Sequence, residues 1–488
     1  MLSACKFSHN SRNTNNLYCI FNTFYIARHQ NKCFFATFAA NNNTKTMEAK
    51  KLYQLYRQHP EITTDSRNCP EGSIFIALKG ESFNGNRFAE AALGKGCSYA
   101  VIDDAEVYAS LPQLHDRLIL VDSCLQTFKD IAREHRRQFS IPVIGITGTN
   151  GKTTTKELIA AVLREKYNTM ATEGNFNNDV GVPKTLLRLN DSHEIAVVEM
   201  GASHPGDIKT LVETVEPTCG IITNVGRAHL QGFGSFEGVK RTKGELYDYL
   251  KQSTPQATTF INADNHDLML MAQERDITNT LLYSQHTNAE AMVTGEVVSC
   301  SPLLRFRWKV NTPDTEWHEV QTHLIGTYNL DNMLAAATIA LHFGVSAQQI
   351  DHALANYIPS NNRSQLEKTQ HNTLIVDAYN ANPTSMAAAI ANFRRMEVKP
   401  KMAILGKMGE LGDVSHEEHQ KVIALLNEAH FDTVWLVGEE YKECNPGFPV
   451  FNNVEEVKAA IAERQPQGFY ILIKGSNSVK LFQLPELL

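Results

Sequence analysis

Short apolar runs alternate with amphipathic stretches through the first part of the sequence after residue 47. Four-to-six-residue apolar runs are typical of strands, and apolar positions spaced three and four apart are typical of helices. On this basis strands are predicted at residues 73–78, 99–102 and 118–121, and helices at 88–93 and 125–138. The pattern predicts a small α/β domain over residues 47–140.

A second run of the same alternation begins at residue 141. The apolar run 141–147 enters a glycine turn, and residues 152–167 follow with Leu158, Ile159, Val162 and Leu163 on one helical face. Further strands are predicted at 194–199 and 218–223, and an alanine-rich helix after Asn329. We expect the strand–helix alternation to continue to about residue 359, which gives a central domain over 141–359 that opens with a nucleotide-binding unit.

The last part of the chain repeats the pattern once more. Apolar runs at 374–376, 402–405, 433–437 and 469–473 are separated by helical segments. Such runs are typical of a parallel sheet covered by helices on both faces. We therefore predict a three-domain α/β protein whose third domain, residues 360–488, is Rossmann-like, in agreement with a rule of about 150 residues per domain.

The first 46 residues differ in composition from the rest. They contain five basic residues and no Asp or Glu, and the apolar stretch within 17–26 is interrupted by Asn22 and Thr23. The segment resembles a transit peptide in its Arg and Ser content but lacks a signal-peptide core. We interpret residues 1–46 as an extension outside the folded domains, with Met47 as a plausible start.

Composition narrows the functional classes. A net charge of -7 offers no basic field for nucleic acid, so no nucleic-acid partner is expected. No run of about 18 apolar residues is present, and no membrane partner is expected. The nine cysteines are scattered without a C-x-x-C pair, which favours reduced thiols in a cytoplasmic protein. We expect a monomer.

A phosphate-binding loop follows the strand at 141–147. Gly151, Lys152 and Thr153 stand where a helix begins, and free backbone N–H groups and the helix dipole there favour an anion. Lysine supplies a point charge, and the threonine hydroxyl can bind magnesium. The strict G-x-x-x-x-G-K-[ST] pattern is missed because Ile146 replaces its first glycine. A turn that merely joins strand to helix is the alternative. The candidate ATP-binding residues of the loop are Gly148, Thr149, Asn150, Gly151, Lys152, Thr153 and Thr154.

Three residues farther along complete a candidate catalytic set with Lys152. Glu199 ends a predicted strand, where ligands bind in open α/β folds; His229 follows the next strand, and Lys243 is expected early on a helix. Magnesium prefers oxygen ligands, so Thr153, Glu199 and the ATP phosphates would form a first metal site. Individually, these residues could equally be a strand-end charge, a loop histidine and a solvated lysine.

The segment T-G-T-N-G-K-T at residues 147–153 resembles the Mur ligase family, which joins a carboxylate to an amine at the expense of ATP. The resemblance extends from about Met47 to the end. It implies a second magnesium site with His229 and Lys243, and that Lys243 is carbamylated by carbon dioxide. A carbamate replaces an ammonium that would repel the metal with a negative group.

The same resemblance assigns the other contacts. It implies that Asn329 and Asn332, three apart on a helix, contact adenine; helix capping by Asn329 is the alternative. It places Arg363 at the γ-phosphate, Asp377 at the nucleotide, and Asn380 and Asn382 at the acceptor.

Four segments, at 174–183, 201–208, 232–235 and 406–412, favour the family member that adds D-Ala-D-Ala to UDP-MurNAc-tripeptide. The substrate-binding residues implied are Asn178 in the first of these segments and Ser66 and Arg67 at the UDP end. Asn84 and Asn86 replace the Asp and His of the family's Asp-Gly-His form, and Asn477 stands where the family commonly has Arg. Whether the third peptide residue is diaminopimelate or lysine is left open.

The expected chemistry is attack of the tripeptide carboxylate on the γ-phosphate of ATP, followed by displacement of phosphate from the acyl phosphate by the amine of D-Ala-D-Ala. Positioning and electrostatic stabilisation of the transferring phosphoryl group would supply the catalysis. The alternatives are a ligase that adds an amino acid to a dipeptide precursor or glutamate to folate, a nucleotide-binding protein without catalysis, and a motor or transport ATPase.

Overall fold

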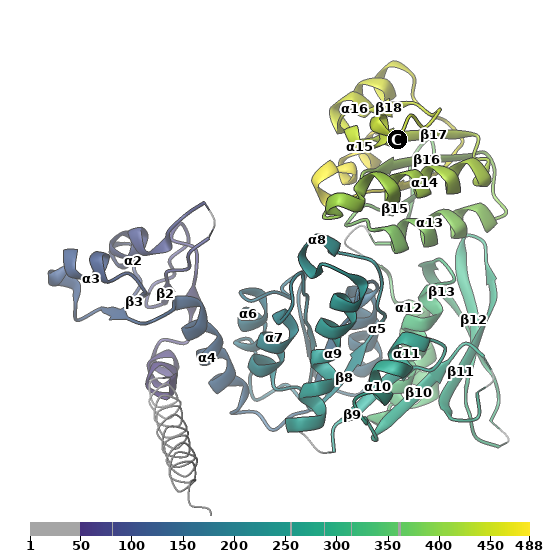
Figure 1. The fold of residues 1–488 in the computed structure, drawn as a ribbon. Coiled ribbons are helices and arrows are strands. Elements are labelled where there is room, and N and C mark those ends of the chain that lie inside the picture. The colour runs from purple at the N-terminus through teal and green to yellow at the C-terminus, as the bar shows by residue number, and fades with distance from the viewer. Residues whose placement is uncertain (1–48, 81, 254–255, 287, 314, 360–362) are drawn as a thin grey trace, which may run out of the picture. The chain divides into compact units, whose positions relative to one another are not determined.

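The computed structural model describes residues 49–80, 82–253, 256–286, 288–313, 315–359 and 363–488. The predicted extension at residues 1–46 and the proposed start at Met47 lie outside the described residues. The chain forms two compact units, one ending at Glu134 and the other running from His135 to Leu488. Three separate sheets confirm the predicted three-domain α/β fold (Figure 1).

The first unit is built on a four-stranded parallel sheet in the order β1-β2-β3-β4. Its strands are β1 (Ile62–Thr63), β2 (Ile74–Ile76), β3 (Tyr99–Ile102) and β4 (Leu118–Leu120), and its helices are α2 (Ala89–Gly94), α3 (Ala105–Ser110) and α4 (Cys124–Arg136), after a helical segment at 49–58. β2 and β3 are buried almost throughout, as parallel strands are. The predicted strand at 99–102 is confirmed residue for residue.

The second unit begins with a nine-stranded sheet in the order β13-β12-β11-β10-β9-β8-β5-β7-β6. The strands are β5 (Val143–Thr147), β6 (Thr169–Ala171), β7 (Ile195–Glu199), β8 (Cys219–Ile222), β9 (Thr258–Asn262), β10 (Thr280–Ser284), β11 (Ala291–Cys300), β12 (Leu303–Val310) and β13 (His318–Ile325). The helices are α5 (Lys152–Arg164), α6 (Gly181–Leu186), α7 (Asp207–Val215), α8 (Leu230–Phe233), α9 (Phe236–Ser253), α10 (His266–Gln273), α11 (Asn329–His342) and α12 (Ala347–Asn356). We call this part the middle domain.

The prediction that strands and helices alternate up to residue 359 is wrong between β10 and α11. β11, β12 and β13 follow one another as an antiparallel meander without intervening helices. A two-residue link between Cys300 and Leu303 cannot carry a parallel crossover. The signal was present in the sequence, because the apolar Leu304, Phe306 and Trp308 alternate with charged residues at the period of a strand with one buried face.

A six-stranded sheet carries the rest of the second unit, which we call the C-terminal domain. Its order is β14-β15-β19-β16-β17-β18, parallel except for β14 at one edge. The strands are β14 (Gln365–Lys368), β15 (Thr373–Asp377), β16 (Lys401–Gly406), β17 (Thr433–Val437), β18 (Val450–Phe451) and β19 (Tyr470–Lys474). Helices α13 (Pro383–Arg395) and α14 (Ser415–Ala429) cover one face, and α16 (Val454–Glu463) covers the other; α15 (Glu439–Glu443) lies between β17 and β18 in the chain (Figure 1).

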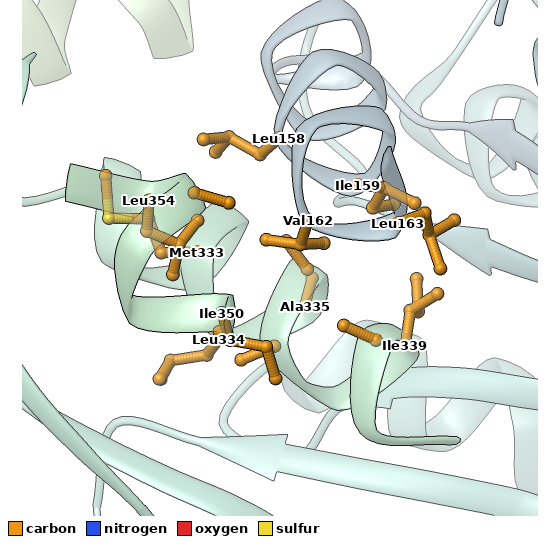
Figure 2. Close-up of a cluster of buried hydrophobic side chains, with 14 of the residues drawn as sticks. Leu158, Ile159, Val162, Leu163, Met333, Leu334, Ala335, Ile339, Ile350 and Leu354 are labelled. Carbon is orange, nitrogen blue, oxygen red and sulfur yellow. The ribbon is translucent and has the colours of Figure 1, made fainter. Parts of the chain in front are cut away.

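The helix that follows the phosphate loop is fixed by a dry core. Leu158, Ile159, Val162 and Leu163 on α5 are fully buried against α11 and α12, as Figure 2 shows. The run of alanines at 335–337 on α11 is also buried and lets the two helices approach closely. Each buried Leu or Ile stabilises the fold by roughly 1.5 to 3 kcal/mol, so the loop at the start of α5 is held by a rigid helix.

The described cysteines, Cys69, Cys97, Cys124, Cys219, Cys300 and Cys444, are all free thiols, and Cys5, Cys19 and Cys33 lie outside the described residues. Within the described part of the chain, no helix has the length and apolar character needed to cross a membrane.

Candidate active site

The phosphate loop has the backbone that its glycines predict. Gly151 precedes α5 with φ of 77°, and Gly148 has φ of 145°. A Cβ at Gly148 would lie 2.1 Å from Oγ1 of Thr223, so no other residue fits there. Because the first N–H groups of a helix have no intrahelical acceptor, the start of α5 presents donors to an anion. The backbone N–H of Asn150 donates to Oδ1 of Asn224 at 3.0 Å, which ties the phosphate loop to the segment that follows β8.

The Lys152 ammonium lies within this loop. Its Nζ donates to the carbonyl oxygens of Gly148 and Thr149, both at 2.9 Å. Burial lowers the pKa of Lys152, opposed by the charge of Glu199 and reinforced by that of Arg363. Charge interactions with Lys152 also influence His229 and Lys243, so Lys152 lies at the electrostatic centre of the predicted catalytic set.

Thr153 and Glu199 meet across the first turn of α5 and the end of β7. The Thr153 hydroxyl donates to the two carboxylate oxygens of Glu199 at 3.1 and 2.9 Å, and Nδ2 of Asn177 donates to Oε1 of Glu199 at 2.7 Å. The Glu199 side chain is fully buried. Among the described residues, no group of three or more His, Cys, Asp or Glu side chains is arranged to hold a metal ion. A metal here would therefore depend on the Thr153 hydroxyl, Glu199 and ligand oxygens.

His229 and Lys243 both contact the ring of Phe233. The rings of His229 and Phe233 meet edge to face with centroids 6.2 Å apart, and Nζ of Lys243 lies over the Phe233 ring at 5.6 Å. Lys243 is near the middle of α9, later than predicted, and only 2% of its surface is exposed. Burial lowers its pKa far below 10.5, with the charge of Lys152 acting in the same direction. Burial also lowers the pKa of His229, opposed by Glu410 and reinforced by the charges of Lys152 and Lys243.

The two asparagines at the start of α11 contact each other. Nδ2 of Asn332 donates to Oδ1 of Asn329 at 2.8 Å, and Oδ1 of Asn332 accepts from the Thr155 hydroxyl at 3.0 Å. Tyr328, not Asn329, occupies the N-cap position, while Nδ2 of Asn329 donates to the carbonyl oxygen of Ile325 at 2.8 Å. The amides therefore link α11 to α5 and to the end of β13.

The C-terminal domain contributes a second set of polar groups. The guanidinium of Arg363 stacks on the ring of Tyr379 at 3.8 Å. Nζ of the buried Lys474 pairs with Oδ2 of Asp377 at 2.6 Å and donates to the carbonyl oxygen of Asn380 at 3.1 Å. Asp377 ends β15 and Lys474 ends β19, and these parallel neighbours bring the two charges to the same sheet edge.

One cleft of about 930 Å³ collects most of the predicted site. Both domains of the second unit line it. Its lining includes Thr149, Asn150, Gly151, Lys152, Thr153, Thr154, Asn178, Glu199, His229, Asn329, Asn332, Arg363, Asp377, Asn380 and Asn382. Lys243 is buried and is not among the lining residues. Asn178 also closes a turn, because its Oδ1 accepts from the N–H of Gly181 at 2.8 Å.

Ser66 and Arg67 belong to the first unit. The Arg67 guanidinium is exposed and pairs with Asp65 at 2.8 Å, and the carbonyl oxygen of Ser66 accepts from Nζ of Lys95 at 2.7 Å. Asn86 is fully buried, and its Nδ2 donates to Oδ1 of Asp103 at 2.8 Å. Asn86 thus links its own segment to Asp103 through a buried hydrogen bond.

The cleft also contains residues that sequence reasoning passed over: Asn177, Asn224, Tyr379, Glu410 and Lys474. All five lie inside or beside segments that the sequence had already marked. The sequence pattern did not identify the residues that they contact. Asn177 contacts Glu199 and Lys474 pairs with Asp377, and neither partner is a neighbour in the sequence.

Comparison with known proteins agrees with this geometry. Three family models match: "Mur ligase family, catalytic domain" at residues 60–136, "Mur ligase middle domain" at 146–340, and "Mur ligase, glutamate ligase domain" at 362–477. The UDP-N-acetylmuramoyl-tripeptide--D-alanyl-D-alanine ligase of Synechocystis is 34% identical over 429 residues, which cover 86% of this chain and 90% of that protein. The chain belongs to the Mur ligase family.

Two solved structures of this family superpose on most of this chain. MurF from Acinetobacter baumannii superposes with a TM-score of 0.77 at 30% identity, covering 87% of this chain and 92% of its own. MurF from Thermotoga maritima, solved in complex with ADP, has a TM-score of 0.75 at 27% identity and covers 88% and 96%. The predicted family membership is confirmed.

Proposed function

We propose that this Mur ligase joins D-Ala-D-Ala to UDP-MurNAc-tripeptide with cleavage of ATP to ADP, a step in peptidoglycan precursor synthesis. The similarity to ligases of that name along nearly the whole length supports the substrate, and the ADP complex of the Thermotoga maritima relative supports the nucleotide. The single observation in the structure that favours a ligase is that one cleft holds both the phosphate loop and the polar loop 377–382 of the C-terminal domain. A simple ATPase needs only the first.

The proposed reaction has two steps, and the charged groups of the cleft support it. The terminal carboxylate of the tripeptide attacks the γ-phosphorus, the bond to ADP breaks, and an acyl phosphate forms. The neutral amine of D-Ala-D-Ala then attacks the acyl carbon, phosphate leaves, and a proton is released. We assign Lys152, Arg363 and the N–H groups of residues 148–154 to the charge that spreads over the transferring phosphoryl group. Asn329 and Asn332 are assigned to adenine and Asp377 to the nucleotide.

Magnesium fits the pair Thr153 and Glu199. A hydroxyl and a carboxylate lie within 3.1 Å of each other in a buried position, and both are oxygen ligands of the kind that magnesium prefers. When bound, the ion would neutralise charge on the phosphate oxygens of ATP. We propose a second site involving His229 and Lys243.

Lys243 suits carbamylation in its surroundings. Among the described residues no ion pair or hydrogen bond to its Nζ is found, and its lowered pKa increases the fraction of neutral amine. Only the neutral amine can add to carbon dioxide, giving a carbamate and a proton. The product would carry a negative charge near Lys152, whose positive charge disfavours a second ammonium at this position. We propose this modification for Lys243.

The remaining contacts are proposals of the same kind. Ser66, Arg67 and Asn178 would bind the nucleotide precursor, and Asn380 and Asn382 the dipeptide. We propose that residues 47–140 form the domain that binds the UDP precursor, residues 141–359 the ATP-binding domain, and residues 360–488 the C-terminal ligase domain. We also propose that the ligase acts as a monomer.

The test is a ligation assay with an acceptor panel. Purified protein, ATP and magnesium would be incubated with UDP-MurNAc-dipeptide or either tripeptide, containing lysine or diaminopimelate, and with D-Ala-D-Ala, D-Ala, L-lysine or meso-diaminopimelate. We expect efficient product only from a tripeptide and D-Ala-D-Ala, and the better tripeptide identifies the third residue. Preferential addition of one amino acid to the dipeptide nucleotide would overturn the assignment.

A further inference from the structure

A contact between the two domains of the second unit lies directly at the candidate active site. Oε2 of Glu410, in the loop after β16, lies in ion-pair contact with Nδ1 of His229, in the loop before α8. The backbone N–H of Gln231 donates to the carbonyl oxygen of the same Glu410 at 3.4 Å. Glu410 therefore contacts this loop through both its side chain and its main chain.

Both partners hold a backbone that is unusual for residues with a Cβ. Glu410 has φ of 60° and His229 has φ of 51°, in the left-handed region. Such conformations persist where the surroundings hold them, and they gather at functional sites. A contact that only joins two domains does not require left-handed backbone conformations at both of its residues.

The contact extends from Glu410 toward Lys243. The His229 ring meets the edge of Phe233 with centroids 6.2 Å apart, and Nζ of Lys243 lies over that same ring at 5.6 Å. A carboxylate beside one imidazole nitrogen keeps the proton on that nitrogen and leaves the other with its lone pair. With Nδ1 directed to Glu410, Nε2 is the nitrogen left for the cleft, which His229 lines.

We propose that Glu410 is a positioning residue of the ligase, which sets the tautomer and orientation of His229 when the C-terminal domain lies against α8. The proposal rests on the proposed function. The catalytic set is then complete only when the C-terminal domain contacts the middle domain, because Glu410, which orients His229, belongs to the C-terminal domain. Nucleotide cleavage is thereby tied to the presence of the domain that carries the acceptor loop.

The first test needs no substrate. Protein labelled with ¹⁵N-histidine is examined by NMR, and the His229 signals are identified by their loss in His229→Asn. We expect the wild type to show the proton on Nδ1, and Glu410→Ala to shift it to Nε2, the tautomer favoured in free histidine. An unchanged His229 spectrum in Glu410→Ala would overturn the proposal, whatever the protein ligates.

The second test is kinetic. Loss of a residue that orients a functional histidine lowers activity by roughly 10- to 100-fold, so we expect Glu410→Ala to lower kcat in that range with little change in the KM for ATP. Glu410→Gln should retain most activity, because its amide oxygen can accept the same hydrogen bond. In the double variant with His229→Ala, we expect no further loss beyond His229→Ala alone. Additive losses would contradict an action through His229.

A matched control tests whether Glu410 orients His229 or only holds the two domains together. The exposed Arg227 pairs with Glu418 of the C-terminal domain at 3.6 Å across the same contact. Arg227→Ala should leave kcat and the His229 signals unchanged, because this ion pair includes neither His229 nor Glu410. An equal loss in Arg227→Ala and Glu410→Ala would show that Glu410 only joins the domains. Failure of the wild type to ligate D-Ala-D-Ala would instead count against the proposed function, and the NMR result would still decide the tautomer.

Discussion

The side-chain amide of Asn382 donates to Oδ1 of Asn150 at 2.8 Å, which joins the C-terminal domain to the phosphate loop. The same asparagine caps α13, since its Oδ1 accepts from the N–H of Ser385 at 2.9 Å. One residue thus caps the start of a helix in one domain and contacts the phosphate loop of the other. If Asn382 also binds the dipeptide acceptor, one residue would contact both the phosphate loop and the acceptor.

We predict that Asn382→Ala raises the KM for ATP as well as the KM for D-Ala-D-Ala. It should also lower the free energy of unfolding by about 1 kcal/mol, as loss of a helix cap does. The matched control is Asn453→Ala, which removes the similar cap of α16 at a residue that does not line the cleft. Steady-state kinetics and urea unfolding of both variants measure the two effects. Equal KM values for ATP in the two variants would argue against a role of Asn382 in the loop.

Asn380 should act on the acceptor alone. Its side chain is exposed to the cleft, and the peptide bond of D-Ala-D-Ala needs hydrogen-bond partners when it is buried. We expect Asn380→Ala to raise the KM for D-Ala-D-Ala, at a cost of roughly 1 to 3 kcal/mol for an unpaired group, with an unchanged KM for ATP. Initial rates over a matrix of both substrates measure this. A change confined to ATP would remove Asn380 from the acceptor site.

Lys152→Ala should abolish ATP turnover while leaving the fold intact. Among the described residues the Lys152 ammonium donates to two loop carbonyls, whereas the core of α5 is apolar. Removing a charge that stabilises a transferring phosphoryl group typically costs about 100- to 1,000-fold in kcat or more. The control is Lys166→Ala, an exposed lysine beyond the other end of α5 that also donates to carbonyls. ADP release and circular dichroism are measured together, and near-normal ligation by folded Lys152→Ala would reject the loop assignment.

Lys243→Ala should inactivate the ligase, and a short carboxylic acid should restore part of the activity by taking the place of the carbamate. Lys240→Ala, one turn earlier on α9 and paired with Glu237, should stay active. Mass spectrometry under carbon dioxide would look for the added carboxylate on the wild type. Full activity of Lys243→Ala would remove the carbamate from the mechanism; failure of rescue alone would reflect weak binding of the acid.

The buried amine also predicts a pH-dependent stability. In buffer depleted of carbon dioxide, the folded protein holds Lys243 with a pKa lowered below 10.5, so the unfolded state binds more protons between these two values. The free energy of unfolding therefore rises with pH across that window. Lys243→Met should be more stable than the wild type at pH 7, and the difference should shrink toward pH 9. Denaturant unfolding at both values measures it, and a difference that grows with pH would reverse the sign of the shift.

The sequence by itself determined the local parts of this protein. Apolar periodicity located β3, β5 and α5, because strand and helix signals depend on residues a few positions apart. The glycines at 148 and 151, followed by a lysine and a threonine, were enough to predict a phosphate loop, since its conformation and its ligand both follow from neighbouring residues. The family motifs added the candidate residues, most of which gather in one cleft.

Only the tertiary structure decided which of these residues meet. Asn150 and Asn382 are 232 positions apart, and nothing local in either segment names the other. The strand order places β7 and β8 on either side of β5, which brings Glu199 to Thr153 and Asn224 to the loop. The Glu410 contact with His229 depends on two domains packing together. Partners so far apart are selected by the burial and hydrogen bonding of the whole fold, because the entropy of closing such long loops is repaid only when many contacts form at once.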